Sequence, residues 1–108
     1  DEIWYPSLST PEFYAQVMRE GGGFGGLISF TVKNEKRSAK VFDAIELSKG
    51  PSLGTDFSLV CPYTLLAHYD ELDWAAGCGV VSHLIRVSVG QEPQDVILSA
   101  FQRALDLV

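Results

Sequence analysis

Residues 83–89 read His-Leu-Ile-Arg-Val-Ser-Val, and this stretch predicts the clearest strand of the chain. Successive side chains of a strand point to opposite faces, so two sets alternate along it. One set is Ile85, Val87 and Val89, and the other is Leu84, Arg86 and Ser88. The first set is entirely β-branched, which is typical of a buried sheet surface. We therefore expect helices to cover the Ile85 face and Arg86 to stand on the opposite face.

A turn at residues 91–93 follows this strand, and Pro93 opens a final helix. Seven apolar residues recur at every third or fourth position through that helix, which gives it one apolar face. A strand followed by such a helix predicts a helix packed on a sheet. The seven residues are Val96, Ile97, Ala100, Phe101, Ala104, Leu105 and Val108.

The segments before residue 83 predict a regular alternation of elements. An extended lead-in (1–8) is followed by a helix that Ser9 or Thr10 caps and Pro11 begins. A glycine run ends that helix, and Gly50 and Pro51 end the next helix, which Asn34 caps. The remaining expected elements are a strand over 27–32, a helix over 35–47 with Val41, Phe42 and Ile45 buried, a strand within 52–60 and a short helix over 70–76. This order predicts an α+β fold, a two-layer α/β sandwich whose small, mostly antiparallel sheet carries helices on one face.

Composition limits the classes of function. The 108 residues predict one domain, and the net charge of −6 with a pI near 4.7 argues against nucleic acid or an anionic membrane as partner. No apolar run approaches the roughly 20 residues that span a bilayer, and the N-terminus does not resemble a signal peptide. Two cysteines, Cys61 and Cys78, are expected to be reduced and structural. We expect a cytoplasmic protein.

Two apparent sites are set aside on physical grounds. Gly21-x-Gly23-x-x-Gly26 matches the dinucleotide fingerprint by letter, but that motif needs a strand before it and a helix after it. The order here is reversed, so a helix stop is expected. His68, Cys78 and His83 match no zinc-ligand spacing, so no metal site is expected. Nor does any local context mark an activated Cys–His pair.

Arg86 is the main candidate for ligand binding. A guanidinium on the open face of a strand can hold a planar carboxylate through two parallel hydrogen bonds. The alternative is an ordinary exposed arginine or one half of an internal ion pair, and spacing alone favours that alternative. The turn over residues 50–55 is a second candidate, because it can present the Ser52 hydroxyl to a ligand.

Five motifs in this order resemble the C-terminal region of the Cys/Met-metabolism (trans-sulfuration) enzymes, the group of the cystathionine γ-synthases, γ-lyases and O-acetylhomoserine sulfhydrylases. They are PSLSTPEFY, GGGFGGLISFTV, SLGTDFSLVCP, LLAH and LIRVSVGQEPQDVILSAFQRAL. The resemblance covers nearly the whole chain. It implies that residues 1–108 form a single small domain that closes over the substrate, and that the N-terminal domain holding pyridoxal 5′-phosphate is absent from this chain.

The resemblance also assigns roles to particular residues. Arg86 matches the arginine that binds the substrate α-carboxylate, and Ser52, followed by Leu53, matches the serine beside the catalytic lysine. Phe57 stands where γ-lyases carry an acidic residue, which implies a more apolar distal pocket or a different nucleophile. Two further departures are Thr55 in place of a glycine and Leu66-Ala67-His68 in place of Met-Thr-His.

No cofactor lysine is expected in this chain. The nearest mimic, Lys33, follows a strand that belongs to the small domain, so we reject it as the Schiff-base lysine. The resemblance therefore implies a PLP-dependent enzyme of which this chain alone is inactive, since the electron sink is the cofactor's.

The implied reaction is a γ-replacement or γ-elimination on an amino acid such as an O-acylhomoserine, cystathionine or methionine. The implied partners are the chain's own PLP domain and, in the intact enzyme, a homotetramer. Two alternatives stay open: a stand-alone, non-catalytic interaction module that keeps the small-domain fold, and an unrelated α/β domain with coincidental motifs.

Overall fold

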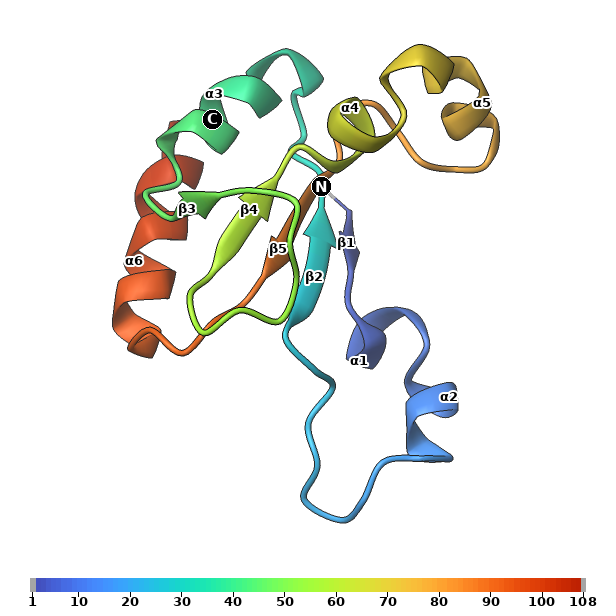
Figure 1. The fold of residues 1–108 in the computed structure, drawn as a ribbon, viewed down its shortest axis with the longest axis vertical. Coiled ribbons are helices and arrows are strands. Elements are labelled where there is room, and N and C mark those ends of the chain that lie inside the picture. Colours follow the sequence, from blue (N-terminus) through green and yellow to red (C-terminus); the bar gives the residue numbers. More distant parts are fainter. Residues whose placement is uncertain (1, 108) are drawn as a thin grey trace.

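A computed structural model describes residues 2–107 of the chain as a five-stranded sheet with helices (Figure 1). The strand order is β1-β2-β5-β4-β3, and every neighbouring pair is antiparallel except β3 and β4. The strands are β1 (Ile3–Trp4), β2 (Leu27–Phe30), β3 (Ser48–Lys49), β4 (Leu59–Cys61) and β5 (Ile85–Ser88). The expected mostly antiparallel α+β fold is confirmed.

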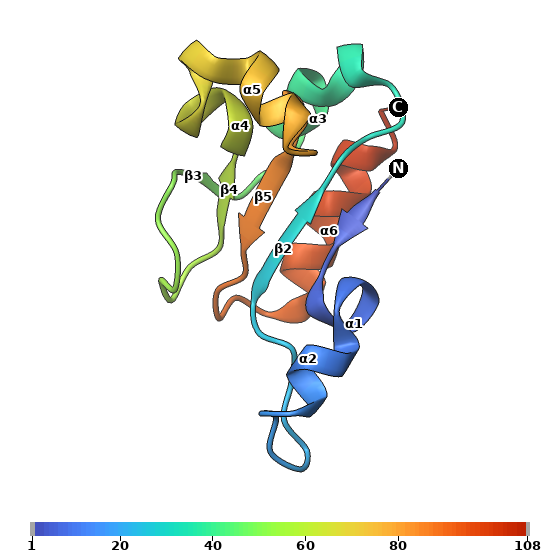
Figure 2. The same ribbon diagram turned by 90° about the vertical axis from the view of Figure 1, so that its right-hand side faces the viewer.

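The helices are short except for the last one. They are α1 (Pro6–Ser9), α2 (Pro11–Ala15), the 3-10 turn η1 (Glu35–Arg37), α3 (Ser38–Ala44), α4 (Tyr63–Ala67), the 3-10 turn η2 (Tyr69–Glu71), α5 (Leu72–Gly77) and α6 (Gln94–Leu105). Figure 2 shows α6 on one side of the sheet and the loop between β3 and β4 on the other.

The core lies between the sheet and α3 with α6. The expected face of β5 is confirmed, because Ile85 and Val87 are buried there, whereas Val89 is 40% exposed just beyond the strand. Alternation brings Ile28 and Phe30 of β2 to the same face. The core residues are Val32, Val41, Ile45, Val60, Ile85, Val87 and Ala104.

The apolar face predicted for α6 is confirmed only in part. Ala100 and Ala104 are buried and Phe101 packs against the core, but Val96 and Leu105 are more than 40% exposed. The apolar repeat is wider than the strip of helix that touches this sheet. Val108, also predicted for that face, lies outside the described residues.

Several expected boundaries were wrong. Pro11 does begin a helix, but it ends at Ala15, and Pro6–Ser9 forms a helical turn within the expected extended lead-in. The helix expected over 35–47 is a 3-10 turn followed by α3, which ends at Ala44. The cap predicted at Asn34 is confirmed, because Asn34 Oδ1 accepts a hydrogen bond from the Lys36 amide. The two-residue strand β3 was not predicted. These errors share a cause, because tertiary packing overrides weak local preference in short elements.

The turn after β5 is fastened to the start of β4 by Glu92. Its carboxylate accepts hydrogen bonds from the Ser58 amide (2.6 Å) and the Ser58 hydroxyl (2.8 Å). Ser58 is fully buried, and its hydroxyl oxygen also accepts from the Gly90 amide at 2.9 Å. The Ser58 amide is the main cause that lowers the pKa of Glu92 below its ordinary value of 4.5.

This lowered pKa predicts a loss of stability in acid. A carboxyl group with a lower pKa in the folded state stabilises the fold above its ordinary value, and that contribution disappears as pH falls through the folded pKa. We expect Glu92→Gln to be less stable than the parent chain at about pH 7, with the difference shrinking as pH falls below 4.5 and through the lower folded pKa. Ser58→Ala should cost about 1–3 kcal/mol at neutral pH.

Urea unfolding of the 108-residue chain at several pH values measures both effects. Glu12→Gln is the matched control, because Glu12 is exposed and the same charge is removed. A constant difference between the parent and Glu92→Gln across this pH range would contradict the assignment.

Candidate functional site

The second face of the sheet, opposite α3 and α6, carries the candidate site. Register places Arg86 of β5 between Cys61 of β4 and Ser29 of β2 on this face. The loop between β3 and β4 passes over the same face (Figure 2). It covers the sheet so well that Leu59, Cys61 and Ser88 are nearly inaccessible to solvent.

Arg86 lies beside this loop and is half-buried. Its Nη2 donates a 2.5 Å hydrogen bond to the Pro51 carbonyl, and its guanidinium carbon lies 5.2 Å from the centre of the Tyr63 ring. Among residues 2–107 it forms no ion pair with a carboxylate. Arg86 is therefore not one half of an ion pair among these residues, and its side chain faces the loop that carries Ser52.

The loop is pinned to the strands at two points. The Gly50 amide donates to the Val60 carbonyl at 3.1 Å, and the Gly54 amide donates to the Ser88 hydroxyl, also at 3.1 Å. Between these points Ser52 and Leu53 are exposed, and Leu53 keeps 52% of its surface. The structure therefore brings Arg86, Ser52 and Leu53 to one neighbourhood while leaving the loop residues open to a ligand.

Phe57 lies at the other end of the loop. Its backbone packs against Gly90, and its side chain is 46% exposed. Gly90 follows Arg86 by four positions, which is about 13 Å along an extended chain. Phe57 is thus separated from Arg86, at a distance that only an extended ligand would bridge.

Among the strand residues that share this face, Arg86 is the only charged one. Burial raises the pKa of the Cys61 thiol, and the nearby positive charge of Arg86 opposes that rise only in part. Cys61 therefore stays an uncharged thiol, and it does not neutralise Arg86. A guanidinium of this kind has several N–H donors, of which the Pro51 carbonyl takes one. Its chemistry suits a carboxylate or another planar anion.

Tyr63 was not identified from the sequence. It follows Cys61 by two residues, and the pairing of Cys61 with Arg86 brings its ring to the guanidinium. Apart from one short helix, residues 61–82 carry no clear local pattern, so the register of Cys61 with Arg86 could not be predicted. A Tyr placed three residues beyond a predicted strand was the only available signal.

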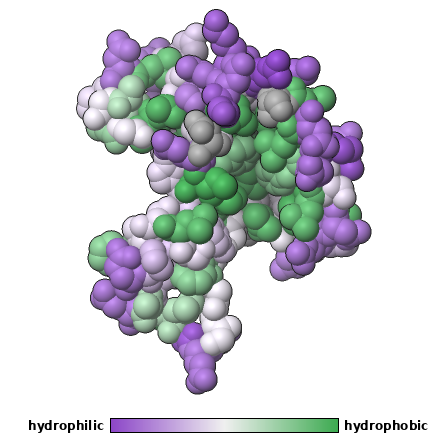
Figure 3. Space-filling model, turned by 180° about the vertical axis from the view of Figure 1, so that it is seen from behind, coloured by the Kyte–Doolittle hydropathy of each residue, from purple (hydrophilic) through white to green (hydrophobic). Residues whose placement is uncertain are grey.

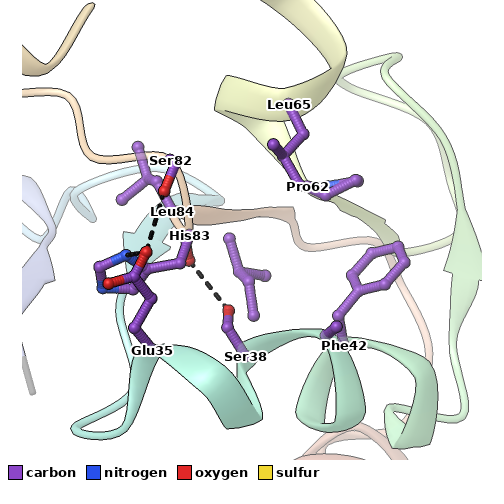
Figure 4. A pocket seen from close by; sticks show the side chains of 10 residues that line it. Glu35, Ser38, Phe42, Pro62, Leu65, Ser82, His83 and Leu84 are labelled. Carbon is purple, nitrogen blue, oxygen red and sulfur yellow. Dashed lines mark hydrogen bonds and ion pairs between the residues drawn. The ribbon is translucent and has the colours of Figure 1, made fainter. Parts of the chain in front are cut away.

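His83 and the glycine fingerprint do not join this site. His83 lines a separate cavity of about 340 Å³ between α3 and α4, where Figure 4 shows its side chain beside Glu35. There Ser82 Oγ donates to Glu35, and Ser38 Oγ donates to the His83 carbonyl, so these polar groups fasten α3 to the lead into β5. Gly26, the last glycine of the fingerprint, precedes β2 directly.

Two further findings concern metals and membranes. In the part of the chain that the structure describes, no three His, Cys, Asp or Glu side chains gather in a way that could hold a metal ion. Within the same residues, no helix has the length and apolar character needed to cross a membrane. Cys61 and Cys78 are free thiols, the first buried and the second exposed.

Comparison with known proteins gives consistent matches. A family model described as "Cys/Met metabolism PLP-dependent enzyme" matches residues 1–106. The cystathionine gamma-synthase of Saccharomyces cerevisiae is 50% identical over 109 residues, covering 97% of this chain and 17% of its own length. That of Neurospora crassa is 50% identical over 104 residues, covering 95% and 17%. The chain thus spans less than a fifth of the length of these relatives.

The fold has a close counterpart among solved structures. The crystal structure of cystathionine gamma-lyase from Lactobacillus plantarum, complexed with L-serine, superposes with a TM-score of 0.82 and 28% identity. The match covers 98% of this chain and 28% of that one.

Proposed function

The chain belongs to the Cys/Met metabolism PLP-dependent enzyme family, and from this premise we propose that it is the C-terminal, substrate-closing domain of a longer trans-sulfuration enzyme. Its task in that enzyme is to bind the α-carboxylate of an amino-acid substrate during γ-replacement or γ-elimination. Relatives at 50% identity are cystathionine gamma-synthases, which favours a γ-replacement.

One observation carries the proposal: the Arg86 guanidinium stands on the loop-covered face of the sheet, half-buried, without a carboxylate partner among residues 2–107. Burying a charge without a partner is costly, and Arg86 is already half-buried. A substrate carboxylate supplies the missing charge and accepts two parallel hydrogen bonds. The related gamma-lyase complexed with L-serine supports an amino acid as ligand class.

The residues around Arg86 suit the rest of such a substrate. Ser52 and Leu53 are exposed beside the guanidinium, where they can contact the groups next to the carboxylate. Phe57 lies next to Gly90, about 13 Å along the chain from Arg86, so its exposed ring can meet only the far end of a long substrate such as cystathionine. An amino acid held in this orientation is fixed at its acid end, and such positioning lowers the entropic cost of reaction.

Neither Lys49 nor Lys33 lies where it could hold a cofactor beside Arg86. Lys49 donates its ammonium hydrogens to the carbonyls of Phe42 and Ile45, both at 2.6 Å, and burial lowers its pKa. Lys33 lines a groove on the helix face, opposite Arg86. When bound elsewhere in the enzyme, pyridoxal phosphate supplies the electron sink for the reaction. We therefore place the cofactor in an N-terminal domain outside this chain.

An exposed apolar groove supports the presence of such a domain. A cavity of about 510 Å³ lies between β1, β2 and α6, and Figure 3 shows hydrophobic side chains gathered in this hollow. Leu98 and Ile3, both on its walls, are more than half exposed. Apolar surface of this extent marks a contact with another part of a protein. We propose that the chain's own N-terminal domain covers it, in a cytoplasmic homotetramer.

Spectroscopy of the longer protein tests this function. We expect a visible absorbance band from bound pyridoxal phosphate that changes when an O-acylhomoserine or cystathionine is added, because the substrate reacts at the cofactor. The measurement is an absorbance titration, with a D-amino acid of the same side chain as control. A folded protein without cofactor absorbance would instead favour the stand-alone interaction module.

A further inference from the structure

The Arg86 guanidinium lies over the ring of Tyr63. The guanidinium carbon lies 5.2 Å from the ring centre, within the range of about 6 Å at which a cation is attracted by an aromatic face. The edge of the same guanidinium is held by the Pro51 carbonyl. Two residues distant in sequence therefore hold the group that would bind a carboxylate.

The position of Tyr63 is itself determined by the strand that carries Arg86. The Tyr63 amide donates to the Leu84 carbonyl at 3.1 Å, two residues before Arg86. The next residue, Thr64, is fully buried, and its hydroxyl donates to the Val81 carbonyl at 2.7 Å. The start of α4 is thus tied to the lead into β5, so the Tyr63 ring and Arg86 belong to one rigid unit.

His68 holds the Tyr63 ring on its outer side. The two rings meet nearly edge to face, with centres 5.7 Å apart and planes at 69°, and the Tyr63 hydroxyl lies 3.5 Å from His68 Nε2. His68 Nδ1 is fixed in turn by the Glu71 carboxylate at 2.7 Å. The Trp74 ring, 6.1 Å from His68, completes the cluster.

We propose that Tyr63, held by His68, is a positioning residue that orients the Arg86 guanidinium for the substrate carboxylate. The proposal rests on the proposed function, since it assumes that Arg86 binds this group. Two parallel hydrogen bonds form only when the guanidinium and the carboxylate lie in the same plane. If the arginine side chain is flexible before binding, ordering it costs entropy and weakens the affinity for the carboxylate. The ring provides that order in advance.

Substitutions at Tyr63 in the longer protein test this role. We expect Tyr63→Leu to raise KM for the amino-acid substrate about three- to tenfold, with kcat and cofactor absorbance unchanged. Tyr63→Phe keeps the aromatic face, so its KM should stay within about twofold of the parent value. Tyr69→Leu is the matched control, because Tyr69 is 71% exposed in the same region and no contact links it to Arg86.

Pentafluorophenylalanine at position 63 gives a second measurement, which does not depend on whether the fold accepts leucine at this position. It keeps the ring's shape but reverses the charge distribution that attracts a cation, so KM should rise as in Tyr63→Leu. A normal KM in this variant would overturn the proposal. So would a Tyr63→Phe that is as impaired as Tyr63→Leu.

Combination with Arg86→Ala separates this proposal from the proposed function. If Arg86→Ala alone leaves KM unchanged, the carboxylate role itself has failed. If Arg86→Ala raises KM and Tyr63→Leu does not, only the positioning role has failed. If Tyr63 acts through Arg86, Tyr63→Leu should add no further rise in the Arg86→Ala background, whereas additive effects would contradict it.

Discussion

Arg86→Ala in the longer protein is expected to raise KM for the amino-acid substrate by at least about 30-fold, the largest functional effect that we predict. Removing one member of a desolvated charge pair costs roughly 2–5 kcal/mol, and about 1.4 kcal/mol corresponds to a factor of ten. The carboxylate would lose both its countercharge and its two hydrogen bonds. Cofactor absorbance should survive, because we place the cofactor in another domain.

Steady-state kinetics with two controls measures this effect. Arg86→Lys keeps the charge but loses the planar fork, so it should recover only part of the lost affinity. Arg103→Ala removes the same charge from α6, where Arg103 pairs with Glu46 on the surface, and should leave KM unchanged. An unchanged KM for Arg86→Ala would disprove the carboxylate role, and loss of cofactor absorbance would point to a structural role instead.

The face on which Arg86 stands could be predicted because strand alternation is a local property. Ile85 and Val87 mark the buried face through their own chemistry, so the side that Arg86 occupies follows without knowledge of any neighbour. The final helix was predictable for the same reason, since its apolar repeat extends over three turns. Long elements with a clear period are determined mostly by nearby residues.

The surroundings of Arg86 could not be predicted, because they depend on contacts distant in sequence. The Pro51 carbonyl is 35 residues from Arg86, and the Tyr63 ring reaches it only through the register of Cys61 with Arg86. Strands of two or three residues, such as β3 and β4, carry too little periodicity to fix a register. Spacing alone favours an ordinary surface arginine, and only the resemblance points to a binding arginine at this position.

Gly90 shows a further limit of sequence reasoning, since nothing local marks it as essential. A Cβ atom added there would lie 2.4 Å from the Phe57 carbonyl carbon and 2.5 Å from the Ser58 nitrogen. Both are backbone atoms, at the point where the turn after β5 passes the start of β4. They cannot move aside as a side chain can, so the two segments would have to separate.

We therefore expect Gly90→Ala to lower the free energy of unfolding by about 3 kcal/mol, the upper part of the range for overpacked sites. For a chain of this size such a loss corresponds to a fall in Tm of roughly 10–20 °C. Separation of these segments would also break the hydrogen bonds from Ser58 to Glu92, so the acid sensitivity attributed to Glu92 should weaken together with stability.

Thermal unfolding of the 108-residue chain measures the loss, and Gly77→Ala is the matched control. An added Cβ at Gly77 meets nothing within 4 Å, and Gly77 ends the helix α5, where alanine is the better helix former. Gly77→Ala should thus leave Tm unchanged or raise it slightly. An unchanged Tm for Gly90→Ala would contradict the close backbone contact between the turn after β5 and residues 57–58. That contact also holds the end of the loop that passes over Arg86.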